Sequence, residues 1–390
     1  MKKNNLEFNN TKIAFNYKSN FDLKRAYFLF KLLSLGYISK FGRKLLKTLV
    51  WMNFPIDSLI KKTVYAQFCG GTDILDCVEV INNLKKNNVY SILDYSIEGS
   101  VNENDFENSI NKCLKILEEC KSKNLSKFIV FKPSAVGRFE LYEKITSNSV
   151  LSENESKEWS KVEIRFNKIC LEASKKDIMV LVDAEESWIQ TAIDELVTKM
   201  MNIYNSEKAV VFNTIQAYRK DRFDYLTKLH NDLKGSFKIG VKLVRGAYME
   251  KERKRAKKYN YISPICENKQ QTDEVFNNSL SFIIENINDF GLFVGSHNEK
   301  SNILATELLR KYKIDSNDQR IWFSQLYGMS DNISFTLAKS GYNVAKYLPF
   351  GPVHEVMPYL MRRLDENSSI SSQTNRELQL IKKELKRRKN

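Results

Sequence analysis

The sequence of residues 343–367, NVAKYLPFGPVHEVMPYLMRRLDEN, predicts a buried strand, a turn with Pro and Gly, and then a helix. On that helix Tyr359, Arg362, Arg363 and Glu366 lie at offsets of zero, three, four and seven, which places them on one stripe. Helices usually turn an apolar stripe toward the core, whereas this stripe carries two adjacent guanidinium groups. Paired arginines form a rigid fork that binds a carboxylate or a phosphate. The stretch therefore predicts a strand–helix unit with an anion-binding group.

The rest of the chain repeats this unit. From residue 89 onward, short β-branched and aromatic runs alternate with longer helical patterns. The runs are continuously apolar, which indicates strands buried on both faces and hence a parallel sheet. Eight strand–helix units predict a (β/α)8 barrel of the TIM type, with extra N-terminal helices and a basic C-terminal helix. The runs are Val89–Tyr95, Lys127–Pro133, Ile178–Asp183, Ala209–Gln216, Phe237–Arg245, Gly291–His297, Ile321–Tyr327 and Val344–Pro349.

Most of these runs end in a polar or reactive side chain. A single one of them means only that an exposed loop begins there. A set of them at the carboxyl ends of successive strands is typical of a barrel active site. The residues are Lys132, Asp183, Gln216, Arg245, His297, Gln325 and Tyr347.

Composition limits the class of protein. The 390 residues are 42% hydrophobic and 28% charged, as in ordinary soluble globular proteins. The net charge of +15 reflects either a Lys- and Asn-rich composition or attraction to an anionic membrane or nucleic acid. Six scattered cysteines without a CxxC pair, and three histidines, predict free thiols and no metal site. No nucleic-acid-binding motif and no GxGxxG fingerprint is present, so we expect no nucleic acid partner and no Rossmann domain.

The two ends of the chain predict helices. The N-terminus MKKNNLEFNN lacks the apolar region of a signal peptide, so we expect a cytoplasmic protein. The segment from Phe21 to Ala66 has a basic polar face, which suits either packing on the main domain or contact with a membrane. The basic segment from Ser368 to Asn390 is interpreted as a solvated tail helix, with a cover over a membrane or flavin site as the alternative. The expected domains are an N-terminal helical segment (1–65), a catalytic barrel (66–367) and the C-terminal helix (368–390).

Seven motifs, in order, resemble the proline dehydrogenase family, and the resemblance runs from about Ala66 to Asn367. It implies an FAD-dependent barrel that oxidises L-proline to Δ1-pyrroline-5-carboxylate and passes electrons to a membrane quinone. The protein would then associate peripherally with the inner face of the membrane. The motifs are DAEE (183–186), IQAY (215–218), KLVRGAY (242–248), FVGSHN (293–298), QLYGMSDNISF (325–335), KYLPFGP (346–352) and YLMRRLDEN (359–367).

The resemblance assigns roles in substrate binding. Arg362 and Arg363 match the paired arginines that bind the proline carboxylate, and Lys132 matches a further cation near it. Asp183 matches the catalytic aspartate. Either Asp183 acts directly, or it organises Lys132 through an ion pair, and the sequence leaves both possibilities open. The residues that match the enclosure of the pyrrolidine ring are Leu326, Tyr347 and Tyr359.

The resemblance also assigns FAD-binding roles. Lys242 matches a basic position near flavin N5, where bifunctional bacterial members usually have Arg. It would act in catalysis, because a cation there stabilises the anionic reduced flavin. Arg245, Gly246 and Ala247 match contacts with the phosphates and the ribityl chain. The remaining cofactor positions are Ala184 and Gln216 at the flavin, Glu366 near the arginine pair, and Ser296, His297 and Asn298 at the adenosine.

Three alternatives remain. In the related hydroxyproline dehydrogenases a smaller residue typically replaces the tyrosine at the position of Tyr347, so Tyr347 favours proline. A Schiff-base aldolase could use Lys132 or Lys242. A basic nucleic-acid-binding protein is the non-enzymatic alternative.

Overall fold

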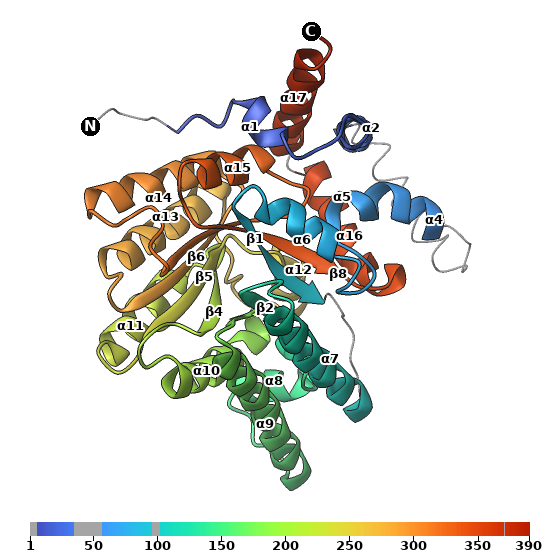
Figure 1. Cartoon of the computed structure of the whole chain (residues 1–390). Coiled ribbons are helices and arrows are strands. Elements are labelled where there is room, and N and C mark those ends of the chain that lie inside the picture. The colour runs from blue at the N-terminus through green and yellow to red at the C-terminus, as the bar shows by residue number, and fades with distance from the viewer. Residues whose placement is uncertain (1–5, 35–56, 96–101, 370) are drawn as a thin grey trace. The chain divides into compact units, whose positions relative to one another are not determined.

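The computed structural model describes residues 6–34, 57–95, 102–369 and 371–390. Its eight strands form a closed parallel barrel in chain order (Figure 1), which confirms the predicted fold. Each strand begins and ends within two residues of its predicted run. The strands are β1 (Val89–Tyr95), β2 (Phe128–Phe131), β3 (Met179–Val182), β4 (Val211–Gln216), β5 (Ile239–Val244), β6 (Phe290–Gly295), β7 (Ile321–Leu326) and β8 (Val344–Phe350).

Helices connect the strands, as parallel pairing requires. The longest of them is capped by Ser152, whose hydroxyl forms a reciprocal capping box with the Glu155 carboxylate. The connecting helices are α7 (Glu103–Ser122), α8 (Phe139–Thr146), α9 (Glu153–Lys176), α10 (Ser187–Tyr204), α11 (Arg222–Leu233), α12 (Met249–Tyr259), α13 (Lys269–Glu285), α14 (Glu299–Lys311) and α15 (Asp331–Lys339), with a 3-10 turn η2 (Pro133–Ala135) after β2.

The chain forms two compact units. The terminal unit comprises Met1–Ile97 and Gln325–Asn390, and the central unit comprises Glu98–Ser324. The expected domain boundaries after residues 65 and 367 stay a prediction.

In the central unit the pairing runs without interruption from β2 to β7. Phe128 of β2 and Phe293 of β6 meet edge to face with ring centres 5.2 Å apart, and Phe212 of β4 contacts Phe293 at 5.1 Å. Because these strands are not neighbours in the sheet, the rings meet across the barrel interior. Trp322 of β7 completes the cluster, at 4.7 Å from Phe128. Large aromatic side chains therefore fill this part of the barrel as a packed core.

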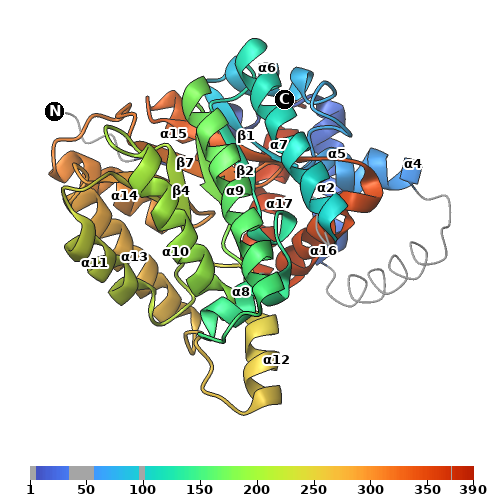
Figure 2. The same ribbon diagram turned by 90° about the horizontal axis from the view of Figure 1, so that it is seen from below.

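The helices of the central unit cover its strands. In Figure 2, α7, α9 and α10 run side by side, and α12 extends away from them. Their apolar stripes are buried, for example Phe166 and Ile169 on α9 and Ile189 and Ile193 on α10.

In the terminal unit β1 and β8 pair in register from Val89 with Val344 to Tyr95 with Phe350. The helices α1, α2 and α16 of this unit pack on α17, α2 most extensively, and the apolar core of the unit includes Phe30, Leu360 and Ile381. Besides α15, the helices of this unit are α1 (Thr11–Phe15), α2 (Asn20–Ser34), α4 (Asp57–Ile60), the π-helical turn η1 (Lys61–Tyr65), α5 (Ala66–Phe68), α6 (Val78–Lys85), α16 (Val353–Ser369) and α17 (Ser371–Arg387).

The C-terminal helix differs from the expected solvated tail. One face of α17 is buried, with Thr374, Glu377, Leu380, Ile381 and Glu384 each at most 4% exposed. These positions recur at offsets of three and four residues, so they form a single helical stripe. The interpretation as a solvated tail is therefore wrong, because this stripe packs on the core of the terminal unit.

The predicted N-terminal helices are present where the structure describes them, and residues 35–56 lie outside the described residues. No helix in the described ranges is long and apolar enough to cross a membrane. All six cysteines are free thiols, as predicted.

Candidate active site

Asp183 and Lys242 form an ion pair at the carboxyl ends of the central strands. Lys242 lies within β5 with a side chain that is 7% exposed, and Asp183 follows β3 with a side chain that is 16% exposed. Lys242 Nζ donates to Asp183 Oδ1. The Asp183 amide donates to the Phe131 carbonyl at 3.0 Å, which continues the β2–β3 pairing to this residue. The structure thus joins two predicted catalytic residues that are far apart in sequence. The predicted pairing of Asp183 with Lys132 stays a prediction.

Lys132 directly follows β2, where it precedes the 3-10 turn η2. The turn is fixed by Glu185, whose carboxylate accepts from the Ser134 amide at 2.9 Å and from the Ser134 hydroxyl at 2.6 Å. Tyr142 adds a hydrogen bond from its hydroxyl to the Pro133 carbonyl at 2.9 Å. The backbone next to Lys132 is therefore held by two buried side chains.

Glu185 is a residue for which the sequence analysis proposed no role. It is 5% exposed, and burial raises its pKa to about 7, while its hydrogen bonds with Ser134 and the charge of Lys132 oppose that rise. The DAEE motif contains this residue, but a run of carboxylates in a loop normally indicates solvent exposure. Its burial depends on Ser134, which lies 51 residues earlier.

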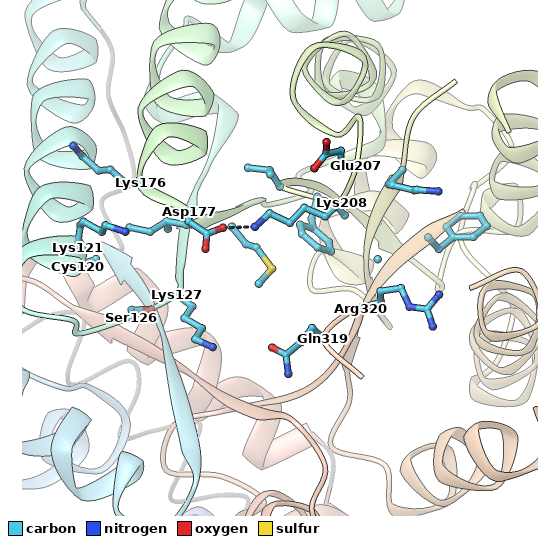
Figure 3. A pocket seen from close by; sticks show the side chains of 18 of the residues that line it. Cys120, Lys121, Ser126, Lys127, Lys176, Asp177, Glu207, Lys208, Gln319 and Arg320 are labelled. Atoms are coloured by element: carbon cyan, nitrogen blue, oxygen red, sulfur yellow. Dashed lines mark hydrogen bonds and ion pairs between the residues drawn. The ribbon is translucent and has the colours of Figure 1, made fainter. Parts of the chain in front are cut away.

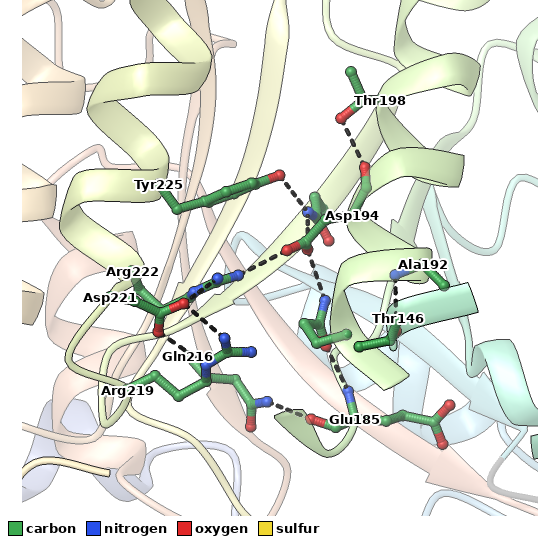
Figure 4. Close-up of polar contacts among 12 residues, drawn as sticks. Thr146, Glu185, Ala192, Asp194, Thr198, Gln216, Arg219, Asp221, Arg222 and Tyr225 are labelled. Atoms are coloured by element: carbon green, nitrogen blue, oxygen red, sulfur yellow. Dashed lines mark hydrogen bonds and ion pairs between the residues drawn. The ribbon is translucent and has the colours of Figure 1, made fainter. Parts of the chain in front are cut away.

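A buried polar network lies under the loop after β3 (Figure 4). The Glu185 amide donates to Gln190 Oε1 at 3.0 Å, and Gln190 Nε2 donates to Asp194 Oδ1 at 2.8 Å. Asp194 also accepts from Asn213 of β4 at 2.8 Å and from Arg222 of α11 at 2.7 Å. Because each member is buried and hydrogen-bonded, the network fixes the loop that carries Asp183.

Gln216 and Ala184 lie beside this loop. Gln216 is 3% exposed, and its Nε2 donates to the Glu185 carbonyl at 2.7 Å (Figure 4). Its Oε1 accepts from the Ala247 amide at 3.3 Å. Ala184 is 7% exposed. Gln216 thereby connects the loop after β3 with the loop after β5.

Arg245 is oriented by three side chains. Its guanidinium donates to Asp273 Oδ1 at 2.8 Å, to Ser296 Oγ at 2.8 Å and to Ser301 Oγ at 2.9 Å. It also lies over the Phe276 ring, 4.4 Å from its centre. The network brings Arg245 close to Ser296. This proximity is compatible with the prediction that both residues contact the same FAD molecule.

Gly246 occupies a backbone conformation that favours glycine. Its φ is +121°, and a Cβ placed there would lie 1.5 Å from Tyr218 Cδ1. Residue 246 must therefore be glycine because the Tyr218 ring leaves no room for a side chain. The sequence alone explains this glycine only by a contact with the cofactor. Gly246 and Ala247 are both exposed, so their backbone can be reached from solvent.

The loop after β6 carries three predicted cofactor residues. Ser296 is 3% exposed, and its hydroxyl accepts from the Asn298 amide at 3.1 Å. Asn298 caps α14, because its side chain accepts from the Ser301 amide at 3.2 Å. His297 lies between them and is half-buried.

In the terminal unit the predicted stripe lies on α16. Arg363 is 6% exposed and Tyr359 is 4% exposed, and Arg363 Cζ lies 5.0 Å from the centre of the Tyr359 ring. Arg362 is half-buried. The structure therefore places the arginine pair and the tyrosine on one helix, as the offsets predicted. Glu366 lies on the same helix, and its side chain is outside the described residues.

The other two predicted substrate residues come from the strands of this unit. Tyr347 of β8 is half-buried, and its carbonyl accepts from the Tyr327 amide at 2.9 Å. Leu326 ends β7 and packs against the apolar core of the terminal unit.

A family model described as proline dehydrogenase matches residues 77–376 of the chain. The chain belongs to the proline dehydrogenase family. It is 32% identical to mitochondrial proline dehydrogenase 1 of Dictyostelium discoideum, over 99% of this chain and 75% of that protein. It is 33% identical to the carbapenem antibiotics biosynthesis protein CarD of Pectobacterium carotovorum subsp. carotovorum, over 82% of this chain and 83% of that protein.

One relative has a different named activity. The hydroxyproline dehydrogenase of Xenopus laevis is 38% identical, over 63% of this chain and 54% of that protein. Among solved structures, proline utilization A (PutA) of Bdellovibrio bacteriovorus, inactivated by N-propargylglycine, aligns with a TM-score of 0.74 and 20% identity. The alignment covers 92% of this chain and 38% of that chain, so it supports the fold alone. Proline dehydrogenases oxidise proline to Δ1-pyrroline-5-carboxylate, and this chain is an enzyme of that family.

Proline dehydrogenases are flavoenzymes, and the donor set of this chain fits FAD. A dinucleotide needs cations for its pyrophosphate and hydrogen-bonding groups for its ring. The central unit provides the buried cation Lys242, the oriented guanidinium of Arg245, the buried amide of Gln216 and the exposed backbone of Gly246 and Ala247.

Proposed function

We propose that this enzyme uses FAD to oxidise L-proline to Δ1-pyrroline-5-carboxylate and passes the electrons to a membrane quinone. The observation that carries the proposal is the buried ion pair between Lys242 and Asp183, on the strand ends where the family's catalytic groups are expected. A Schiff-base aldolase would leave the Arg362–Arg363 pair and the SHN motif (296–298) unexplained, and no nucleic-acid-binding motif is present.

Substrate binding is assigned to groups of matching charge and shape. Arg362 and Arg363 bind the proline carboxylate, and Lys132 adds positive charge. Leu326, Tyr347 and Tyr359 enclose the pyrrolidine ring, and their apolar surfaces exclude water from the carbon that is oxidised.

FAD, when bound, supplies the acceptor for the hydride that leaves C5 of proline. Lys242, Arg245, Gly246, Ala247 and Gln216 would hold it, with Ala184 at the flavin, Ser296, His297 and Asn298 at the adenosine, and Glu366 near the arginine pair. Asp183 keeps Lys242 in place by accepting from its Nζ. Proline reacts as the free amine, after its ammonium has released one proton to solvent. As the C5–H bond breaks, the nitrogen lone pair forms the C5=N bond and the remaining N–H proton passes to solvent, so the ring nitrogen of the product is an uncharged imine. Positioning of C5 by the carboxylate-binding arginines supplies much of the rate enhancement.

Electron transfer to quinone requires contact with a membrane. The net charge of +15 favours binding to an anionic lipid surface. Each Lys or Arg close to such a surface contributes about 1 kcal/mol to the binding free energy. We therefore propose peripheral association with the inner face of the membrane.

Hydroxyproline oxidation is the second candidate, and the similarity to the Xenopus laevis protein is the observation in its favour. Tyr347 favours proline, because its bulk opposes the 4-hydroxyl group.

Anaerobic titration of the purified protein tests the substrate and the cofactor. Flavin bands at the start, bleached by L-proline and much less by trans-4-hydroxy-L-proline, are the expected result. Addition of a soluble quinone should restore the bands. A protein that stays colourless after FAD is supplied would overturn the proposal, and preferential bleaching by hydroxyproline would establish the second candidate instead.

A further inference from the structure

A cavity of about 590 Å³ lies at the amino-terminal ends of the strands of the central unit (Figure 3). Its floor includes Ile178 and Met179 where β3 begins, Val210 and Phe212 at β4, and Phe290 at β6. Asp183 and Lys242 lie toward the opposite ends of β3 and β5. The cavity is therefore distinct from the candidate active site. Its volume is within the range of ligand-binding pockets, roughly 300–1,000 Å³.

Positive charge dominates the rim of this cavity. Among the described residues that line it there are six cations and two carboxylates, Asp177 and Glu207. Three of the cations directly precede a strand, since Lys127 comes before β2, Lys238 before β5 and Arg320 before β7. The parallel barrel thus arranges them around the same opening. The six cations are Lys121, Lys127, Lys176, Lys208, Lys238 and Arg320.

Two of these cations are oriented by one residue. Asn288 accepts from Lys238 Nζ through its backbone carbonyl at 2.8 Å and from Arg320 Nη1 through its side chain at 2.8 Å. Arg320 is held further by Asp318, at 2.6 Å from Nη2. Lys127 Nζ lies 6.0 Å from the centre of the Trp322 ring. These groups are held in place before any ligand arrives, which lowers the entropic cost of binding.

Carboxylates offset part of this charge, since Arg320 pairs with Asp318, and Lys176 pairs with Glu118 at 2.9 Å and with Glu172 at 3.7 Å. Lys208 pairs with Asp177, but both side chains are at least 65% exposed, and such pairs contribute about 0–1 kcal/mol. An incoming anion can therefore replace Asp177 at small cost. A concave surface with an excess of positive charge and an apolar floor attracts anions and raises their local concentration.

We propose that this cavity binds a small ligand that carries a polyphosphate chain. Lysine ammonium groups are point charges that can bind phosphate oxygens from many directions. A ligand with a single carboxylate would contact only one or two of the six cations, whereas a polyphosphate chain can contact several. A nucleoside triphosphate and a free inorganic polyphosphate share this chemistry. The apolar floor offers a surface for a nucleobase, which free polyphosphate lacks.

Isothermal titration calorimetry with the FAD-loaded protein tests the proposal, using sodium tripolyphosphate, ATP and adenosine as separate ligands. We expect tripolyphosphate and ATP to bind with one site per chain and adenosine alone to bind at least about tenfold more weakly, because charge dominates the site. ATP that binds more tightly than tripolyphosphate would identify a nucleotide as the ligand, and equal affinities would identify the phosphate chain alone.

A charge-reversed variant separates this site from the general basic surface. Lys127→Glu/Lys208→Glu should weaken tripolyphosphate binding by at least about tenfold, since attraction becomes repulsion. Lys157→Glu/Lys199→Glu is the matched control, because it makes the same change in net charge at two exposed lysines outside the cavity. Equal loss of binding in both variants, or no binding by the unaltered protein, would overturn the proposal. Tripolyphosphate binding at one site per chain that is retained in the control variant and lost in Lys127→Glu/Lys208→Glu would support the proposal. Thermal unfolding checks that both variants are folded.

Discussion

Lys346 Nζ lies 2.9 Å from Asp331 Oδ1, and the side chains are 0% and 2% exposed. Asp331 also accepts from Lys18 Nζ and from the Tyr17 hydroxyl, each at 2.9 Å. Burial alone would raise the pKa of Asp331, but the charges of Lys18 and Lys346 outweigh it and lower the pKa to about 2. Lys346 donates further to the Met329 carbonyl at 2.5 Å. This network ties β8, α15 and the N-terminal residues together within the terminal unit.

Replacing Lys346 should therefore destabilise the protein strongly. Lys346→Met keeps the approximate length of the side chain but leaves Asp331 with one fewer cation in a buried site. Loss of one partner of a buried pair costs roughly 3–5 kcal/mol. Urea unfolding should show this difference, while Lys339→Met, at an exposed position of α15, should change stability by no more than about 0.5 kcal/mol. Equal midpoints for the two variants would contradict the structural role.

Glu377 predicts a pH dependence of stability. It is 4% exposed and accepts from the Ser330 amide, and burial, followed by the charge of Asp331, raises its pKa to about 7. The folded state therefore keeps a proton that the unfolded state releases near its ordinary pKa of 4.5. The contribution of Glu377 to the free energy of unfolding is fully present below about pH 4.5 and is lost as the pH rises through 7. The loss is up to about 3 kcal/mol. Glu377→Gln should flatten this decline in urea unfolding at pH 5, 6 and 7. Parallel pH profiles for the two proteins would contradict the prediction.

The barrel was predictable because its signal is local. Each strand is a short apolar run that ends near a polar residue, and the helix after it has its own period, so β1 was located without any tertiary contact. The strand ends also located Asp183, whereas Lys242 was assigned only through the family resemblance. Their mutual ion pair was not predicted, because nothing in the sequence specifies which of several strand-end cations reaches a given carboxylate.

Buried polar residues account for most of what the sequence did not reveal. The stripe of α17 that packs on the core contains Thr374, Glu377 and Glu384, whereas hydrophobic periodicity detects only apolar stripes. The role of Glu185 was not predicted for the same reason, because it is a buried polar residue and leaves no apolar pattern in the sequence. A buried charge becomes predictable only when its partners are known, and those partners are distant in sequence.

Asp183→Asn tests whether the carboxylate acts in turnover. Asn keeps the size of the side chain but removes the charge that faces Lys242. If Asp183 acts directly, we expect proline turnover to fall by about 100-fold or more with FAD still bound. Stopped-flow reduction of the flavin by proline measures this. Asp194→Asn is a control for the buried network under the same loop, since Asp194 lies on α10 and pairs with Arg222. Near-normal turnover by Asp183→Asn with FAD bound would exclude a direct role.

Gly246→Ala should impair both folding and cofactor retention. The new Cβ would overlap the Tyr218 ring, and the φ of +121° is unfavourable for alanine, so we expect a loss of at least about 3 kcal/mol. Gly235→Ala is the matched control, because its φ is +83° but no atom lies within 4 Å of the added Cβ. Its cost should be about 1–2 kcal/mol. Urea unfolding and the flavin absorbance per chain measure the two effects, and Gly246→Ala/Tyr218→Ala should recover part of the loss. Equal costs for the two single variants would show that the Tyr218 contact is unimportant.

Tyr347→Ser tests the choice between proline and hydroxyproline. Tyr347 is half-buried on β8, and its removal would open space for a 4-hydroxyl group that a tyrosine ring excludes. We expect kcat/KM for L-proline to fall by roughly tenfold, because apolar contact with the pyrrolidine ring is lost, at about 1–3 kcal/mol for such a contact. The value for trans-4-hydroxy-L-proline should fall less or rise. Tyr347→Phe separates size from polarity, since it keeps the ring and should keep the preference for proline. If Tyr347→Ser and Tyr347→Phe discriminate equally between the two substrates, then the bulk of this side chain does not set the specificity.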